Sequence, residues 1–421
     1  MRHTSETRRK FFAKSSALLG ASAASTLPSF AAGKPAEQVI DYYDKLGVNK
    51  IINAAGTYTF LTASIMPPQV QAAVAQAAKH PVRLAELQKA SSEYLAKKLK
   101  CEGALVTAGA ASALTLGTAA CMTVAHPTAI QKMPVDMAGL KNEVIVQKAH
   151  RYDYDHALLN CGIRFVEVET LADYEKAFTG QTVMAHFFNA AEEGRISRQD
   201  WLRVAHRHDV PCFNDAAADV PPISNLWAYT QMGFDLVTFS GGKGIRGPQN
   251  AGLLLGRKDL IAAAVANDAP ISESIGRGMK VAKEQIVGMV AAVDWFTDQS
   301  EEAMQAEFHA RADRIIAQLN SIPTLEATVV VPQVANHVPH LLLNYDHSRV
   351  KIAAREVAEQ LRHGNPSIEL NPSTGLKNTQ GLTGEKDTIV VGVWMLQPGE
   401  DLVVARRLHD VLSKAADPVR V

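Results

Sequence analysis

From Ile51 onward, short apolar segments alternate along the chain with longer amphipathic ones. The short segments have the length of buried strands: 104–107, 143–146, 164–167, 183–187, 210–213, 236–239 and 252–255. The longer segments repeat their apolar residues at helical spacing: 86–99, 111–122, 197–208 and 258–266. Ser197, with Asp200 three residues later, suits the start of one of these helices. Alternating strands and helices predict an α/β fold with a mostly parallel sheet covered by helices.

Ligands of such sheets bind at the carboxyl ends of the strands, so residues just after the strand segments are the candidates for chemistry. Lys243 follows the segment 236–239 in a glycine-rich turn, Ser240-Gly241-Gly242-Lys243-Gly244. Glycines permit tight turns and close approach of the backbone to a ligand. A partly desolvated lysine can form a Schiff base with a carbonyl group. On the turn alone, a solvated loop lysine is an equally good interpretation.

Other strand segments end in the same way. A turn of small residues follows the first segment and opens a helix: Gly109, Ala110, Ala111 and Ser112. The bare N–H groups and positive dipole end of a helix start suit a phosphate. His150 follows the second segment, where by itself it would be a surface or capping residue. Asp215 precedes three alanines, where it could pair with a buried cation or cap a helix.

The order of these parts is phosphate turn, histidine, aspartate, serine and lysine. In this order the chain resembles fold-type I pyridoxal 5′-phosphate (PLP) enzymes of the class V aminotransferase-like group. Within this group it resembles selenocysteine synthase (L-seryl-tRNA(Sec) selenium transferase) and D-glucosaminate-6-phosphate ammonia-lyase. The stretches 52–57, 240–249 and 361–368 carry it. Gly242 stands where selenocysteine synthases usually have an acidic residue, which moves the likeness toward the ammonia-lyases.

The resemblance implies a role for each of these residues. Lys243 would bind PLP covalently and then remove the α-proton of the substrate. Asp215 would hydrogen-bond the pyridine nitrogen and keep the ring an effective electron sink. His150 would stack over the ring, and Ala217 would pack on the opposite ring face.

The phosphate and the substrate would have their own contacts. The turn 109–112 would hold the phosphate, together with the hydroxyl of Ser240. Arg246, Arg277 and Lys280 are candidates to bind a substrate carboxylate or phosphate, although solvated basic residues are an equally good interpretation. The segment 272–280 resembles one that reaches into the partner's active site, so we expect a homodimer or a higher homo-oligomer.

The C-terminal part of the chain resembles the small α+β domain of this fold. Strands are expected over 340–343, 367–370 and 388–391, and helices over 351–362 and 401–414. We therefore expect an N-terminal segment and large PLP-binding domain over 32–310, and a small domain over 311–421.

Composition excludes several classes of protein. Lys and Arg together number 43, as do Asp and Glu, and no basic stripe stands out beyond the first residues, so no nucleic-acid partner is expected. No internal apolar run is long enough to span a membrane. Four widely spaced cysteines lack CxxC or Cys/His ligand spacing, which predicts free thiols and no metal site.

The N-terminus resembles a twin-arginine export signal. Arg8 and Arg9 precede two phenylalanines, a weakly apolar stretch covers 17–24, and a small-x-small cleavage site ends at Ala31. The alternative is a disordered basic tail. We expect residues 1–31 to be removed and the mature protein, from about Ala32, to be periplasmic.

The sequence therefore predicts an exported, PLP-dependent enzyme that acts on a small amino acid or amino-sugar acid. The favoured reaction is removal of the α-proton followed by β-elimination. An amino-acid racemase or an aminotransferase is the alternative, because the same electron sink permits both. A non-catalytic binding protein with this fold is a further hypothesis, which the intact Lys243, Asp215 and Ser240 disfavour.

Overall fold

The computed structural model describes residues 40–189, 194–332, 335, 337–379 and 382–416. The chain divides into two compact units, residues 1–49 and 50–421. The described part of the first unit contains helix α1 (Tyr42–Leu46), which the side chain of Asp41 caps. The expected export signal, with Arg8 and Arg9, lies outside the described residues. Within the part of the chain that is described, no helix has both the length and the apolar character to cross a membrane.

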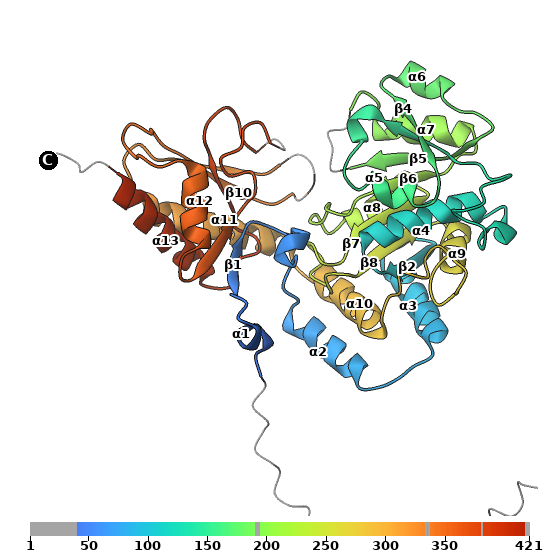
Figure 1. Ribbon diagram of the computed structural model, residues 1–421, viewed down its shortest axis with the longest axis horizontal. Helices are drawn as coiled ribbons and strands as arrows, with labels where there is room; N and C mark the ends of the chain where they lie inside the picture. Colours follow the sequence, from blue (N-terminus) through green and yellow to red (C-terminus); the bar gives the residue numbers. More distant parts are fainter. Residues whose placement is uncertain (1–39, 190–193, 333–334, 336, 380–381, 417–421) are drawn as a thin grey trace, which may run out of the picture. The chain divides into compact units, whose positions relative to one another are not determined.

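The larger unit is built around a sheet of seven strands in the order β2-β8-β7-β6-β5-β3-β4 (Figure 1). The strands are β2 (Gly103–Thr107), β3 (Glu143–Gln147), β4 (Arg164–Val168), β5 (Thr182–Phe188), β6 (Cys212–Asp215), β7 (Leu236–Ser240) and β8 (Gly252–Gly256). Neighbouring strands are parallel from β7 to β4, whereas β8 is antiparallel to both β2 and β7. The predicted α/β fold with a mostly parallel sheet is therefore confirmed.

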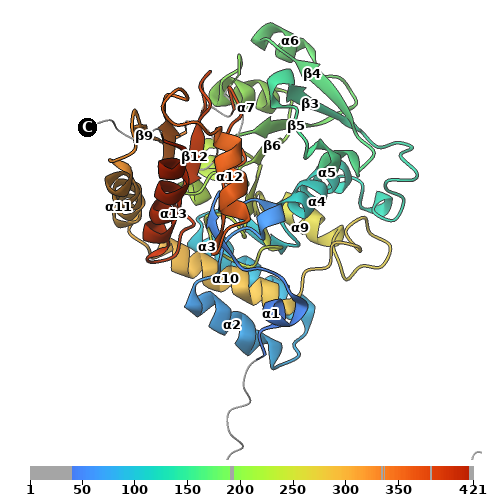
Figure 2. The same cartoon turned by 60° about the vertical axis from the view of Figure 1, so that its left-hand side comes forward.

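Helices cover both faces of this sheet. They are α2 (Pro68–Ala78), α3 (Leu84–Lys98), α4 (Ala110–Thr123), α5 (Asp155–Leu159), α6 (Leu171–Lys176), α7 (Arg198–Arg207), α8 (Asn225–Met232), α9 (Lys258–Ala266) and α10 (Lys283–Thr297). Successive strand residues enter separate apolar clusters, as expected for two buried faces. Leu253 and Leu255 of β8 join one cluster, and Leu254 joins the other. Helices α2 and α10 lie side by side in both views (Figures 1 and 2).

Local contacts explain where two of these elements begin. The Ser197 hydroxyl accepts a hydrogen bond from the Asp200 N–H at 3.1 Å, so the predicted helix cap is present. Strand β6 begins at Cys212 rather than at the expected Val210. The N–H of Val210 donates to the carbonyl of Ala205 in α7, so this residue caps the end of that helix instead of pairing in the sheet.

Two glycines allow α4 to lie close to the sheet. A Cβ atom on Gly117 would stand 2.4 Å from the buried ring of Phe213. A Cβ atom on Gly252 would stand 2.5 Å from the carbonyl carbon of Gly109, just before α4. Because side chains are excluded at both positions, the start of α4 is held directly against the start of β8.

A separate apolar core lies in the C-terminal part of the chain. It is formed by α11 (Glu301–Leu319), β9 (Glu326–Val330), β10 (His340–Asn344), α12 (Ala354–Arg362), β11 (Ser367–Leu370), β12 (Ile389–Gly392) and α13 (Glu400–Ala415). Strands β12-β10-β9 form an antiparallel sheet. Strand β1 (Ile51–Ala54), from far earlier in the chain, pairs in parallel with β11 and adds Ile52 and Ala54 to this core. Figure 2 shows α12 and α13 side by side.

Candidate active site

A cavity of about 220 Å³ lies at the carboxyl ends of β2, β6 and β7. Several predicted site residues line it: Lys243, Asp215, Ala217, Ser240, Gly109, Ala110 and Ala111. They come from turns that are far apart in the sequence but meet at one edge of the sheet. Convergence of polar groups at a switch point of such a sheet is typical of a ligand site.

Lys243 stands on a turn that close backbone packing holds in place. The carbonyl of Gly242 accepts hydrogen bonds from the N–H and the hydroxyl of Ser64, at 2.9 and 2.7 Å. A Cβ atom on Gly244 would stand 2.0 Å from the carbonyl oxygen of Val220. Burial lowers the pKa of Lys243, while the charges of Asp215 and Asp219 oppose that shift. A freely solvated loop lysine is therefore not what the structure shows.

Asp215 is buried at the end of β6, and protein donors contact both of its carboxylate oxygens. The Tyr152 hydroxyl donates to Oδ2 at 2.5 Å, and the N–H of Ala217 donates to Oδ1 at 2.9 Å. Burial raises the pKa of Asp215, and these two hydrogen bonds counteract the rise. No helix follows directly, since α8 begins only at Asn225, so the alternative of a helix cap is excluded.

His150 is not where the resemblance implied. Its ring is fully buried, packs edge-on against Phe187 at 4.5 Å and does not line the cavity. Its Nδ1 accepts the N–H of Phe188 at 3.4 Å. The chain forms a short 3₁₀ turn over Lys148–His150 after β3, and this turn places His150 in the core. Tyr152 lines the cavity instead and stacks on Phe188 with ring centroids 3.9 Å apart.

The predicted phosphate turn adopts the geometry of an anion site. Gly109 precedes α4 with a φ of 92°, and no side chain caps the helix start. Its first-turn N–H groups are therefore available to an anion. Ser112 differs from the expectation: its hydroxyl donates to the carbonyl of Ala108 at 2.8 Å, and its side chain does not line the cavity. The contribution of this residue is thus limited to its backbone.

The structure does not bring the three candidate substrate-binding residues to this cavity. Arg277 and Lys280 are exposed, and neither lines it. Arg246 lines a different cavity, and its Nε donates to the carbonyl of Ile65 at 2.8 Å. A role for Arg277 or Lys280 in catalysis would therefore require another copy of the chain.

Several lining residues were not predicted from the sequence: Thr59, Leu114, Tyr152, Tyr154, Phe188, Ala218 and Gln249. Asp219 was not predicted either; it is a buried carboxylate near Lys243, and burial raises its pKa to about 7. The position of Tyr152 after a strand was a usable signal. The sequence pattern does not indicate, however, which side chain after β3 points into the cavity.

Residues 167–364 match the aminotransferase class V family. These residues therefore form an aminotransferase class V domain, and the seven-stranded sheet with the lysine and aspartate at its edge is that of fold-type I, PLP-dependent enzymes.

Individual relatives align over most of the chain. D-glucosaminate-6-phosphate ammonia lyase of Salmonella typhimurium is 28% identical over 89% of this chain and 99% of its own length. A solved structure of D-glucosaminate-6-phosphate ammonia-lyase superposes with a TM-score of 0.76 at 26% identity, covering 90% of this chain and all of that one. A 5'-C-glycyluridine monooxygenase-decarboxylase of Streptomyces is 29% identical (78% of this chain, 83% of that protein). An L-seryl-tRNA(Sec) selenium transferase of Moorella thermoacetica is 25% identical (93% and 88%).

The cofactor of this class is PLP, and the residues of the cavity fit it. A lysine of lowered pKa suits a covalent link to an aldehyde, and the buried carboxylate suits a protonated ring nitrogen. The uncapped start of α4 suits the phosphate. Ala217 leaves room for a flat ring because its side chain is a single methyl group.

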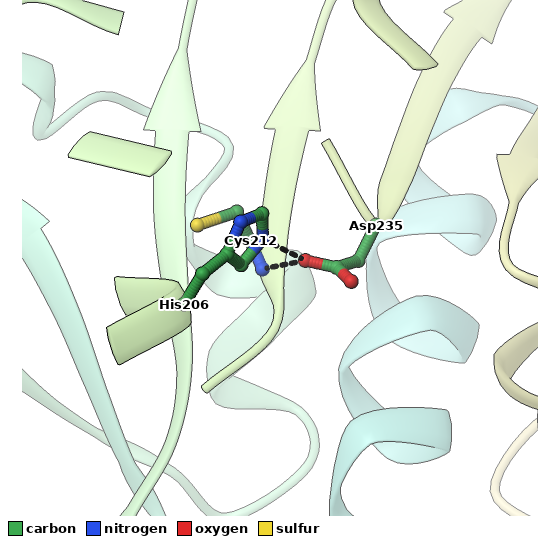
Figure 3. Close-up of side chains that lie close together, drawn as sticks. All are labelled: His206, Cys212 and Asp235. Atoms are coloured by element: carbon green, nitrogen blue, oxygen red, sulfur yellow. Dashed lines mark hydrogen bonds and ion pairs between the residues drawn. The ribbon is translucent and has the colours of Figure 1, made fainter. Parts of the chain in front are cut away.

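Three residues of types that can bind a metal ion lie together at the start of β6, the end of that strand away from Asp215. His206, Cys212 and Asp235 have ligand atoms within 4.8 Å of one another (Figure 3). The Asp235 carboxylate already contacts the N–H of Cys212 at 2.7 Å, Nε2 of His206 at 3.0 Å and Nη1 of Arg257 at 3.1 Å. Burial holds the pKa of the Cys212 thiol well above its usual range, which disfavours the thiolate a metal requires. We interpret the cluster as a structural link between β6 and β7.

All four cysteines have free thiols, as expected.

The bond from Tyr152 to Asp215 yields a testable prediction. Tyr152→Phe removes a hydrogen bond that favours the charged carboxylate, so the pKa of Asp215 should rise further. The acid limb of the kcat/KM profile should then move to higher pH, and the rate at neutral pH should fall roughly tenfold. Steady-state kinetics as a function of pH measures both effects.

Tyr154→Phe is the matched control, since Tyr154 lines the same cavity and is exposed. It should leave the acid limb in place. Equal shifts in the two variants would show that the profile does not depend on the Asp215 contact.

Proposed function

We propose that this protein is a PLP-dependent lyase that removes the α-proton of a small amino acid or amino-sugar acid and then eliminates a group from the β-carbon. The observation that carries the proposal is the cavity in which Lys243 and Asp215 converge with the uncapped start of α4. The ammonia-lyase relative, which aligns along 99% of its own length, supports elimination rather than another outcome.

When bound, PLP supplies the electron sink that stabilises a carbanion at the α-carbon. Lys243 would hold the cofactor, and its amine, when free, would accept the α-proton of the substrate. Its lowered pKa increases the neutral fraction that this step needs. Asp215 would keep a proton on the ring nitrogen, and Tyr152 together with the N–H of Ala217 fixes the direction of its carboxylate. The start of α4 would hold the phosphate, and the small side chain of Ala217 would leave room for the ring.

The same residues would serve a racemase or an aminotransferase until the α-proton has left. The outcomes then differ in where the electrons and the proton go. Elimination expels a β-substituent, racemisation returns a proton from the opposite face, and transamination places it on the cofactor. The alignment with an ammonia lyase favours the first outcome. A binding protein without chemistry would have no need of the paired Lys243 and Asp215.

The reaction class is tested by product analysis. With a panel of D- and L-amino acids and amino-sugar acids that carry a β-hydroxyl group, the holoenzyme should release ammonia and a 2-oxo acid in equal amounts. Lys243→Ala should lose the absorbance band of the lysine-bound cofactor, and its kcat should fall by at least roughly 10³-fold because base and covalent link disappear together.

Lys148→Ala is the control variant, because Lys148 is exposed and paired with Glu169 away from the cavity. It should keep both the band and the turnover. A racemised substrate or a pyridoxamine product, without release of ammonia, would replace the lyase proposal by one of its alternatives.

We further propose a homodimer whose active sites are shared between subunits. Arg277 and Lys280 are exposed outside the cavity of their own chain, as expected if they complete the site of a partner. Inactive Lys243→Ala and Arg277→Ala proteins, mixed and allowed to exchange subunits, should regain roughly a quarter of wild-type activity, since half of the random dimers carry one intact site. Sedimentation should give the mass of a dimer. A monomeric mass without complementation would contradict this arrangement.

We also propose export to the periplasm by the twin-arginine route. The support is the sequence of residues 1–31, which places paired arginines before a weakly apolar stretch and a cleavage site. This route carries folded proteins, so PLP would be bound in the cytoplasm before export. Replacing Arg8 and Arg9 by lysine should leave active, PLP-loaded protein in the cytoplasm, as cell fractionation and absorbance would measure. Normal processing of this variant would point to the general secretory route instead.

A further inference from the structure

A second cavity, of about 290 Å³, lies on another side of the turn that carries Lys243. Gly244 and Arg246 of the turn line it, with Trp295 at the end of α10, Arg311 of α11 and Trp394 after β12. It shares no lining residue with the candidate active site. We call it the arginine cavity.

Arg246 lies in the arginine cavity without an acidic partner among the described residues. Its Nε donates to the backbone carbonyl of Ile65, and its guanidinium lies 5.5 Å from the ring centroid of Trp295. The backbone of Arg246 has a φ of 57°, a conformation uncommon for a residue with a side chain. Burial, and secondarily the charge of Arg311, lower the pKa of Arg246. The positive charge of this half-buried guanidinium is therefore balanced by one hydrogen bond and one aromatic contact, without an opposite charge from the described part of the chain.

The remaining charges do not neutralise the arginine cavity. Arg311 donates through Nη1 to the carbonyls of Val393 and Leu396, at 3.2 and 2.6 Å, and through Nε to Glu307 at 3.0 Å. Glu307 is the one carboxylate in the lining, and it is shared with Arg314, also at 3.0 Å. Two guanidinium groups therefore face this space against a single carboxylate that a third arginine also contacts.

We propose that the arginine cavity is a second binding site, for a small organic anion that has a carboxylate or phosphate group and an apolar or aromatic body. The anionic group would bind at Arg246, whose terminal nitrogens are suited to a bidentate contact. The body would lie against Trp295, Trp394 and Phe308, which supply the apolar part of the lining. The site is distinct from the PLP cavity, so its ligand and the substrate can be bound together.

The proposal is tested by titrating the PLP-loaded protein with 1-naphthoate, which has an anionic group and an aromatic body, and with inorganic phosphate, which lacks the body. Calorimetry should show naphthoate bound more tightly than phosphate, with an affinity that falls as salt increases. Arg246→Gln should weaken naphthoate binding roughly tenfold or more. Glu307→Gln should strengthen it severalfold, because the competing carboxylate is removed.

Opposite effects of these two variants cannot come from a common loss of folding. Arg83→Gln is the charge-matched control, since Arg83 is exposed and does not line the arginine cavity. It should bind naphthoate as the wild type does. Saturation with an amino-acid substrate of the enzyme should leave naphthoate affinity unchanged.

Three results would overturn the proposal: no binding by the wild type at millimolar naphthoate, equal affinity of the Arg246→Gln protein, or displacement of naphthoate by substrate. Equal affinity for the neutral analogue 2-naphthol would likewise contradict an anion site. That comparison separates binding to the arginines from adsorption onto the aromatic lining.

Discussion

The buried carboxylate of Asp215 is the group on which the arrangement of the active site depends. A charge at the end of β6 is costly unless hydrogen bonds or opposite charges compensate it. Tyr152 and the N–H of Ala217 supply two hydrogen bonds, and Lys243 supplies an opposite charge. These contacts come from the chain after β3, β6 and β7, so the carboxylate joins three strand ends at one point. Substituting Tyr152 or Lys243 would remove a contact that opposes the effect of burial on the pKa of Asp215.

Backbone packing then places the other groups around that carboxylate. Gly252 lets β8 approach the start of α4, and Gly244 lets the lysine turn approach Val220. Neither contact leaves room for a Cβ atom, so the distances between turns are set by main-chain atoms rather than by flexible side chains. A site built this way is largely formed before its ligand arrives, which lowers the entropic cost of binding.

The sequence predicted the sheet well because strand burial leaves a strong and local pattern. The segments around Leu254 and Val237 are apolar on both sides, as strands covered on two faces must be. Lys243 and Asp215 were found because they follow such segments directly. The side chains of His150 and Ser112 do not line the cavity as expected, because the direction of a side chain just beyond a strand depends on the turn that follows. A 3₁₀ turn buries the imidazole, and a bond to Ala108 engages the hydroxyl.

Pairing between distant segments was also beyond the reach of sequence periodicity. Strand β1 precedes the large sheet in the chain, yet it pairs with β11. The hydrophobic pattern of β1 does not indicate which strand it pairs with. The cluster of His206, Cys212 and Asp235 has the same origin, since three elements bring together residues whose spacing matches no ligand motif. Such contacts follow from topology, which is decided by the packing of whole elements.

The turn after β7 shows how one short segment can serve two cavities. Lys243 lines the cavity with Asp215, whereas Arg246, three residues later, lines the arginine cavity. The change of direction passes through the left-handed backbone of Arg246, which costs on the order of 1 kcal/mol for a residue with a side chain. The hydrogen bond to Ile65 and the contact with Trp295 offset that cost and hold the guanidinium away from the lysine. A glycine would adopt this backbone more readily, but it would lose the contacts with Ile65 and Trp295 that the arginine side chain makes.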